Sequence, residues 1–149
     1  MNRLPEGTQL KVLVIEDDPF ARTSISGALT NAGLNVVAAV GDARSAIYCF
    51  TMHDPDVIVA DLDLGFGPTG IDLARSFRIR KPKLGIVVLT SYTDPRLLRN
   101  DIPVLPPGCE YLVKHHISEM QFVKTSVTKA FANVNSDVLV SVGTRTPDW

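Results

Sequence analysis

Residues 12–22 read VLVIEDDPFAR. Four apolar residues are followed by three acids and then by Pro19, which suits the first turn of a helix. A strand therefore gives way to a helix through an acidic turn, which is typical of a β-α unit around a parallel sheet. Because short apolar runs alternate with helical periodicity along the rest of the chain, we expect an α/β fold.

The other elements follow from the same two periodicities. Five strands are predicted, at 11–16, 36–40, 56–61, 84–90 and 110–114. Asp18, Asp42 and Ser118 are the expected N-caps of the first, second and last helices. Four prolines between 95 and 108 leave room only for a short or irregular fourth helix. The predicted buried helix positions are Ala21, Ile25, Ala28, Leu29 and Ala32 in the first helix, Ala43, Ala46, Ile47 and Phe50 in the second, Leu73, Ala74 and Phe77 in the third, and Val123, Val127, Ala130 and Phe131 in the last.

The composition favours one globular domain. The 149 residues are 45% apolar and 21% charged, which is enough apolar surface for a core. The net charge of −1 excludes the global basic field of a nonspecific nucleic-acid binder. Every strongly apolar run is far shorter than the roughly 20 residues of a membrane helix, and the N-terminus has no secretory signal. Two cysteines suit neither a disulfide scaffold nor a zinc site, so we expect a cytoplasmic protein without membrane or nucleic-acid contacts.

Polar residues gather where the predicted strands end. In a parallel sheet, ligands bind beyond the carboxyl ends of the strands, and here those ends carry Glu16, Asp17, Asp61, Thr90 and Lys114. Clustered carboxylates repel one another unless a cation holds them, and Mg²⁺ prefers such hard oxygen ligands. A hydroxyl and an ammonium beside the ion suit phosphoryl oxygens. The set therefore predicts a Mg²⁺ site and, with no other catalytic motif in view, carboxylate attack on phosphorus.

In combination, these motifs resemble the receiver domain of bacterial response regulators, the phosphoacceptor module of two-component signalling. The resemblance covers residues 10 to about 134 and implies a single doubly wound, flavodoxin-like sheet of five parallel strands in the order 2-1-3-4-5, with flanking helices. It implies an N-terminal extension over 1–9, the receiver over 10–133 and a tail or linker over 134–149. It rests on VLVIEDDPFAR (12–22), PDVIVADLDLGFGPTGIDLA (55–74), IVVLTSYTDPR (86–96) and GCEYLVK (108–114), which occur in the family's order.

The resemblance gives the acids their roles. It implies that Asp61 accepts a phosphoryl group from a histidine kinase or phosphotransfer protein. Asp17 resembles the direct Mg²⁺ ligand, Glu16 its partner that binds the ion through water, and Asp63 the residue that offers a backbone carbonyl to the metal. Such a chain is not an enzyme beyond its own phosphorylation and dephosphorylation.

The resemblance also implies a switch. Thr90 resembles the hydroxyl that moves onto the phosphoryl group, Tyr111 the aromatic switch residue, and Lys114 the lysine that pairs with phosphate. Two departures stand out: His115 replaces the family's usual proline, and IPVLPPG (102–108) replaces the rest of the fourth helix. We expect this proline-rich segment to be irregular and, with Tyr111 and the last helix, to form a signalling or homodimer surface.

Three functions stay open at this point. The first is a phosphorylated receiver, alone or as the N-terminal part of a longer transcriptional regulator. The second is a pseudo-receiver that binds partners without phosphorylation, which His115 and the proline-rich segment favour and the complete acidic pocket opposes. The third is a small Mg²⁺-dependent phosphatase with Asp61 as nucleophile, in which Asp63 resembles the acid of haloacid-dehalogenase-type enzymes. A structural reading also exists, in which Glu16 and Asp17 are ordinary turn acids.

Overall fold

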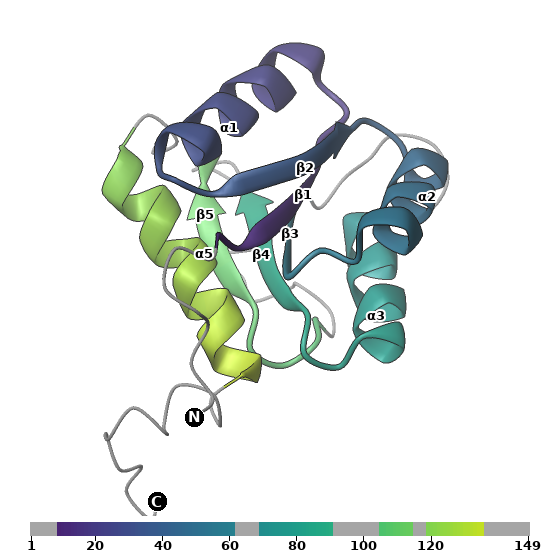
Figure 1. Cartoon of the computed structure of the whole chain (residues 1–149). Coiled ribbons are helices and arrows are strands. Elements are labelled where there is room, and N and C mark those ends of the chain that lie inside the picture. The colour runs from purple at the N-terminus through teal and green to yellow at the C-terminus, as the bar shows by residue number, and fades with distance from the viewer. Residues whose placement is uncertain (1–8, 62–68, 91–104, 115–118, 136–149) are drawn as a thin grey trace, which may run out of the picture.

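The structure is a computed structural model that describes residues 9–61, 69–90, 105–114 and 119–135. These ranges contain five strands and four helices (Figure 1). The strands are β1 (Lys11–Ile15), β2 (Asn35–Val40), β3 (Val57–Asp61), β4 (Gly85–Thr90) and β5 (Glu110–Val113). The helices are α1 (Pro19–Asn31), α2 (Ala43–His53), α3 (Gly70–Arg80) and α5 (Met120–Val134). Most of the predicted irregular fourth helix falls in 91–104, outside the described residues.

The strands form one parallel sheet in the order β2-β1-β3-β4-β5, which confirms the order that the family resemblance implied. β1 lies between β2 and β3, so the acidic turn after β1 is next to the end of β3. β1 and β5 each end one residue earlier than expected, so Glu16 and Lys114 directly follow their strands. The topology therefore brings five of the predicted site residues to one edge of the sheet, namely Glu16, Asp17, Asp61, Thr90 and Lys114.

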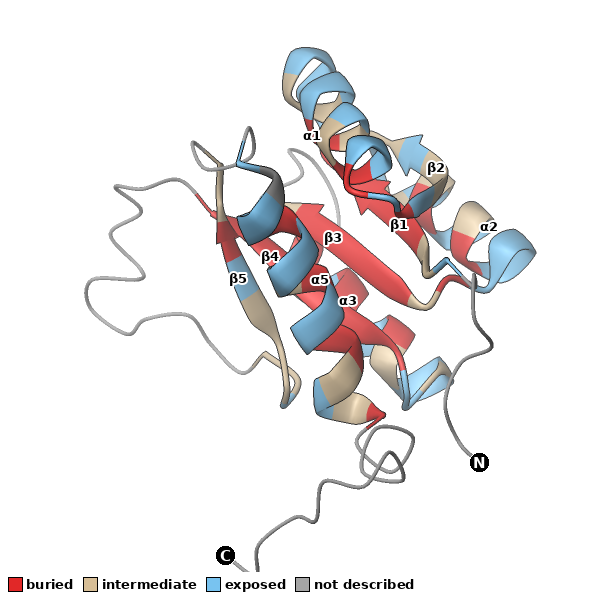
Figure 2. Ribbon diagram, turned by 60° about the vertical axis from the view of Figure 1, so that its left-hand side comes forward, coloured by how far each residue is buried: buried red, intermediate tan, exposed pale blue. Residues whose placement is uncertain are grey.

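Two apolar layers hold the helices to the sheet. Alternate residues of β1 point to opposite faces, as the period of a strand requires. Val12 and Val14 pack with α1 and α5, whereas Leu13 and Ile15 pack with α2 and α3. Figure 2 shows the three central strands β1, β3 and β4 as the most buried part of the molecule, whereas the edge strands β2 and β5 are more exposed. No helix within the described ranges is both long and apolar enough to cross a membrane.

The predicted helix caps are confirmed for the first two helices and wrong for the last. Asp18 accepts a hydrogen bond from the backbone N–H of Ala21 (2.8 Å), and Asp42 accepts one from Ser45 (2.8 Å). α5 begins after Glu119, which makes no side-chain capping bond. Because the N-cap position falls on residue 119, a hydroxyl at position 118 is one residue too early to cap this helix.

One predicted core residue of the second helix is also wrong. Ala46 and Phe50 are buried, but Ile47 is 43% exposed. The Phe50 ring stacks on Phe77 of α3 with centroids 4.1 Å apart, and the Arg80 guanidinium lies 5.0 Å from the Phe50 centroid. This stack turns the Ala46–Phe50 side of α2 toward the core, so the neighbouring position 47 faces outward.

The described end of the proline-rich segment is irregular and anchored. Leu105 is only partly exposed and packs against the core beside α3. Arg78 donates to the carbonyl oxygen of Pro107 (2.6 Å), and Asn133 donates to that of Gly108 (2.9 Å). The turn before β5 is therefore held by helices on both faces of the sheet, whereas 102–104 lie outside the described residues.

Candidate functional site

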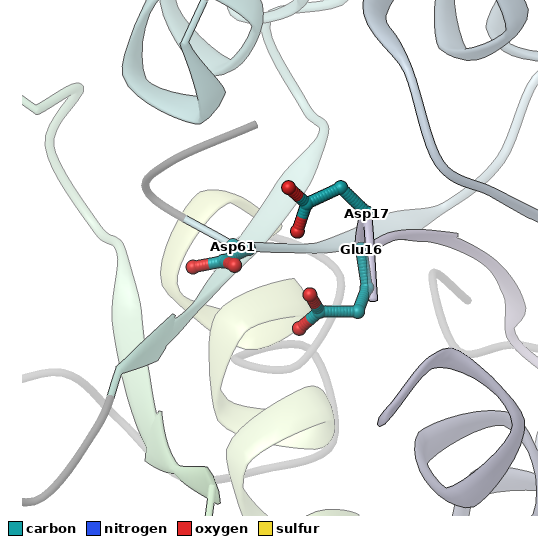
Figure 3. Close-up of side chains that lie close together, drawn as sticks. All are labelled: Glu16, Asp17 and Asp61. Atoms are coloured by element: carbon teal, nitrogen blue, oxygen red, sulfur yellow. The ribbon is translucent and has the colours of Figure 1, made fainter. Parts of the chain in front are cut away.

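Three carboxylates meet at the carboxyl edge of the sheet. Glu16 and Asp17 follow β1, and Asp61 is the last residue of β3. Each offers an oxygen within 4.8 Å of the others, and Figure 3 shows the three side chains gathered around a common space. The neighbouring pairing of β1 with β3 explains this cluster, because it brings together two strand ends that are distant in sequence.

The three acids differ sharply in burial. Glu16 is 0% exposed, Asp61 is partly buried and Asp17 is exposed. Burial raises the pKa of Glu16, and the nearby charge of Asp61 adds to this increase. The Lys114 ammonium and the N–H of Asp18, which donates to Glu16 Oε2 (3.1 Å), oppose it. Within the cluster, exposure to solvent therefore increases from Glu16 through Asp61 to Asp17.

Lys114 connects two of these acids. Its Nζ lies 2.9 Å from Glu16 Oε1 and donates to Asp61 Oδ2 at 3.1 Å. Burial acts to lower the pKa of Lys114, but the hydrogen bonds and charges of Glu16 and Asp61 outweigh it and leave that pKa raised. The lysine therefore stays cationic at neutral pH and supplies a fixed positive charge beside the Asp61 carboxylate.

The donor set fits a hard divalent cation. Three carboxylates face one ammonium, so the cluster keeps an excess of negative charge. Glu16 Oε1 is buried, and its partner in the described part of the chain is the Lys114 ammonium at 2.9 Å, which leaves a second lone pair on this oxygen. A buried carboxylate oxygen with spare acceptor capacity suits a metal-bound water. Asp63, the expected source of a backbone carbonyl ligand, lies outside the described residues.

Thr90 and Tyr111 lie close to this edge on β4 and β5. Thr90 ends β4 and is 2% exposed. Its register partner on β5 is Val113, and Tyr111 pairs with Val88 two residues earlier. Because side chains alternate along a strand, Thr90 and Tyr111 share one face of the sheet. Tyr111 is 45% exposed, so Thr90 is buried inside the fold whereas Tyr111 reaches its surface.

Arg22 is a site neighbour that sequence reasoning missed. Its Nη1 donates to the backbone carbonyl of Glu16 (2.8 Å) and lies against Gly41 at the end of β2. The position one helical turn after Asp18 could have placed Arg22 above the acidic turn. The contact with Gly41 had no signal in the sequence, because it depends on how β2 packs against α1.

Comparison with known proteins agrees with this geometry. The model of the family described as response regulator receiver domain matches residues 12–104. The probable transcriptional regulatory protein TcrX of Mycobacterium tuberculosis is 35% identical over 89 residues, which are 60% of this chain and 37% of the relative. The virulence transcriptional regulatory protein PhoP of Salmonella typhimurium is 30% identical over 132 residues, which are 87% of this chain and 57% of the relative. The chain thus spans about a third to somewhat over half of these relatives.

Solved structures agree on the fold. A response regulator receiver domain protein from Clostridium thermocellum is similar with a TM-score of 0.66 and 23% identity, covering 88% of this chain and 98% of the other. The response regulator PhyR from Brucella abortus gives a TM-score of 0.72 at 18% identity, covering 94% of this chain and 54% of the other. The parallel sheet, the acidic cluster at its edge and the family match over residues 12–104 lead to one conclusion: the chain belongs to the family of two-component response regulator receiver domains.

Proposed function

We propose that Asp61 accepts a phosphoryl group from a histidine kinase or phosphotransfer protein in a Mg²⁺-dependent phosphorelay. The observation that carries this proposal is the meeting of Asp61 with two further acids, Glu16 and Asp17, and with the Lys114 ammonium. In the transfer, an Asp61 oxygen forms a bond to phosphorus while the bond from phosphorus to the donor histidine nitrogen breaks. The electron pair of that bond returns to the imidazole ring.

The surrounding residues have separate tasks in this proposal. Lys114, 3.1 Å from Asp61 Oδ2, neutralises charge that the phosphoryl oxygens bring to the site. Thr90 donates a hydrogen bond from its hydroxyl to the phosphoryl group. Tyr111, on the same face of the sheet, transmits the resulting movement of Thr90 to the surface. Asp17, Glu16 and Asp61, with the backbone carbonyl of Asp63, would hold the Mg²⁺ ion. When bound, the ion supplies positive charge that draws the phosphoryl oxygens and the Asp61 carboxylate together.

The regions through which the receiver would pass on its signal lie outside the acidic cluster. We assign the receiver to 10–133, an extension to 1–9 and a tail or linker to 134–149. The relatives described as transcriptional regulatory proteins support a role in a longer transcriptional regulator, because this chain spans only part of their length. A signalling or homodimer surface would include the proline-rich segment, Tyr111 and α5.

Incubation with acetyl phosphate and Mg²⁺, followed by intact mass measurement, tests the proposal. We expect one phosphoryl adduct on the parent and none on Asp61→Asn, because an amide is nearly isosteric with the carboxylate but a poor nucleophile. Matching circular dichroism spectra would show that both proteins are folded. An unmodified parent would favour the pseudo-receiver, whereas consumption of acetyl phosphate without an adduct would favour the phosphatase. An adduct that persists on Asp61→Asn would remove Asp61 as the acceptor.

A further inference from the structure

Arg22 contacts the peptide unit that joins Glu16 and Asp17, the two acids that follow β1. Its Nη1 donates to the carbonyl oxygen of Glu16 at 2.8 Å, and that carbonyl shares a planar peptide unit with the N–H of Asp17. The hydrogen bond therefore restricts the orientation of this peptide unit, and with it the positions from which the Glu16 and Asp17 side chains extend. Arg22 belongs to the first turn of α1, where its own N–H donates to the carbonyl oxygen of Asp18 (2.9 Å).

Gly41 leaves room for the Arg22 guanidinium, because it has no side chain. A Cβ at this position would lie 2.5 Å from Arg22 Nη1 and 3.5 Å from the Glu16 carbonyl oxygen. A separation of 2.5 Å is well inside van der Waals contact, so any side chain at Gly41 would push the guanidinium off the Glu16 carbonyl. Gly41 directly follows Val40, whose carbonyl oxygen accepts from the Glu16 N–H (2.9 Å). The end of β2 thus supports Glu16 both directly and through Arg22.

We propose that Arg22, seated on Gly41, is a positioning residue that holds Glu16 and Asp17 in the arrangement that binds Mg²⁺. The inference rests on the proposed function, since it concerns the same metal site. Besides its ion pair with Lys114, Glu16 is then restrained at three points: its N–H by Val40, its carbonyl by Arg22, and its Oε2 by the N–H of Asp18. Partners that orient metal ligands typically change metal affinity by about 10- to 100-fold when they are removed.

Positioning and simple charge predict opposite results for Arg22→Ala. A guanidinium near a cation site repels the cation, so if Arg22 acted only through its charge, its removal would strengthen Mg²⁺ binding. If Arg22 orients the acids, its removal weakens binding despite the lost repulsion. The sign of the change in the dissociation constant therefore separates the two roles.

A double-mutant cycle tests the link between Arg22 and Gly41. Isothermal titration calorimetry with MgCl₂ on the full chain would compare the parent, Arg22→Ala, Gly41→Ala and the double variant. We expect each single change to weaken Mg²⁺ binding about tenfold or more. Because Gly41→Ala acts by displacing the guanidinium, it should add little when Arg22 is already alanine. Gly27→Ala, in the same helix α1 as Arg22, is the matched control, since a Cβ there meets no atom within 4 Å apart from the neighbouring backbone of its own helix, and it should leave the affinity unchanged.

Thermal unfolding without Mg²⁺ would show that each variant is folded under the titration conditions. If Gly41→Ala does not fold, the Arg22 variants alone test the inference. Arg22→Lys keeps the positive charge and an N–H donor, so it should bind Mg²⁺ more tightly than Arg22→Ala. Equal or tighter binding by Arg22→Ala than by the parent would overturn the inference while leaving the proposed function intact. A parent that binds no Mg²⁺ would instead overturn the proposed function and the inference with it.

Discussion

Asp17→Asn offers the most direct perturbation of the acidic cluster. The Asp17 carboxylate lies within 4.8 Å of an oxygen on each of Glu16 and Asp61. At that distance two unit charges in water repel by about 0.9 kcal/mol, and the water value applies because Asp17 is exposed. The Lys114 ammonium, which is paired with both of those acids, offsets part of this repulsion, so removal of the Asp17 charge should stabilise the Mg²⁺-free fold by about 1 kcal/mol. For a chain of this size, that corresponds to a rise in Tm of about 2–4 °C.

Mg²⁺ should reverse the order of the two proteins. A ligand at 100 times its dissociation constant stabilises the native state by about 2.7 kcal/mol, so the parent should gain several degrees when saturated. Asp17→Asn lacks one carboxylate of the set and should gain much less. Thermal unfolding followed by circular dichroism, with and without MgCl₂ at constant ionic strength, measures both effects.

Asp18→Asn is the matched control. It removes the same charge from the next residue, and asparagine caps a helix about as well as aspartate does at this position. We therefore expect Asp18→Asn to keep the parent's response to Mg²⁺. The reasoning is refuted if the two variants respond alike, or if Asp17→Asn retains the full stabilisation by Mg²⁺.

Three further predictions address packing, thiol reactivity and pH. Gly85→Ala should lower the free energy of unfolding by about 1–3 kcal/mol, because a Cβ there would lie 2.9 Å from a backbone nitrogen of α5. Gly27→Ala, in an open helical position, should raise it by up to about 1 kcal/mol, and urea unfolding that gave both changes the same sign would contradict the geometry. Burial raises the pKa of Cys109 from 9.0 to about 11, so alkylation at pH 8 should be about a hundredfold slower than in the unfolded chain, and equal peptide-resolved labelling rates would count against this. The raised pKa of Glu16 means that acidification protonates this ligand at a higher pH than an ordinary glutamate, so Mg²⁺ affinity should fall as pH drops through that pKa. Calorimetry across pH should show this step in the parent and lose it in Glu16→Gln, and an unchanged step in the variant would assign it to another group.

The elements of this fold were predictable because their signals are local. The apolar run of β1, the cap at Asp18 and Pro19 at the first helical position lie within eight residues of one another along the chain. The predicted cluster of acids followed from one general rule, since the carboxyl ends of parallel strands meet at one edge. Pairing of β1 with β3 then brought Asp61 beside Glu16 and Asp17.

Other features depended on contacts between distant segments. The outward position of Ile47 follows from the stack of Phe50 on Phe77, which joins α2 to α3. Helical periodicity alone assigns 46, 47 and 50 to nearby directions and cannot decide which of them a neighbouring helix will cover.

The sequence by itself determined the α/β pattern, the strand ends to within one residue and the residue types of the candidate site. Only the tertiary structure decided that Glu16 is buried while the adjacent Asp17 is exposed, and that Lys114 lies 2.9 Å from Glu16. Likewise, only packing of α1 against β2 placed Arg22 on Gly41. The physical reason is that periodicity and capping act within a few residues along the chain, whereas burial and charge pairing depend on side chains that the fold brings together from distant positions.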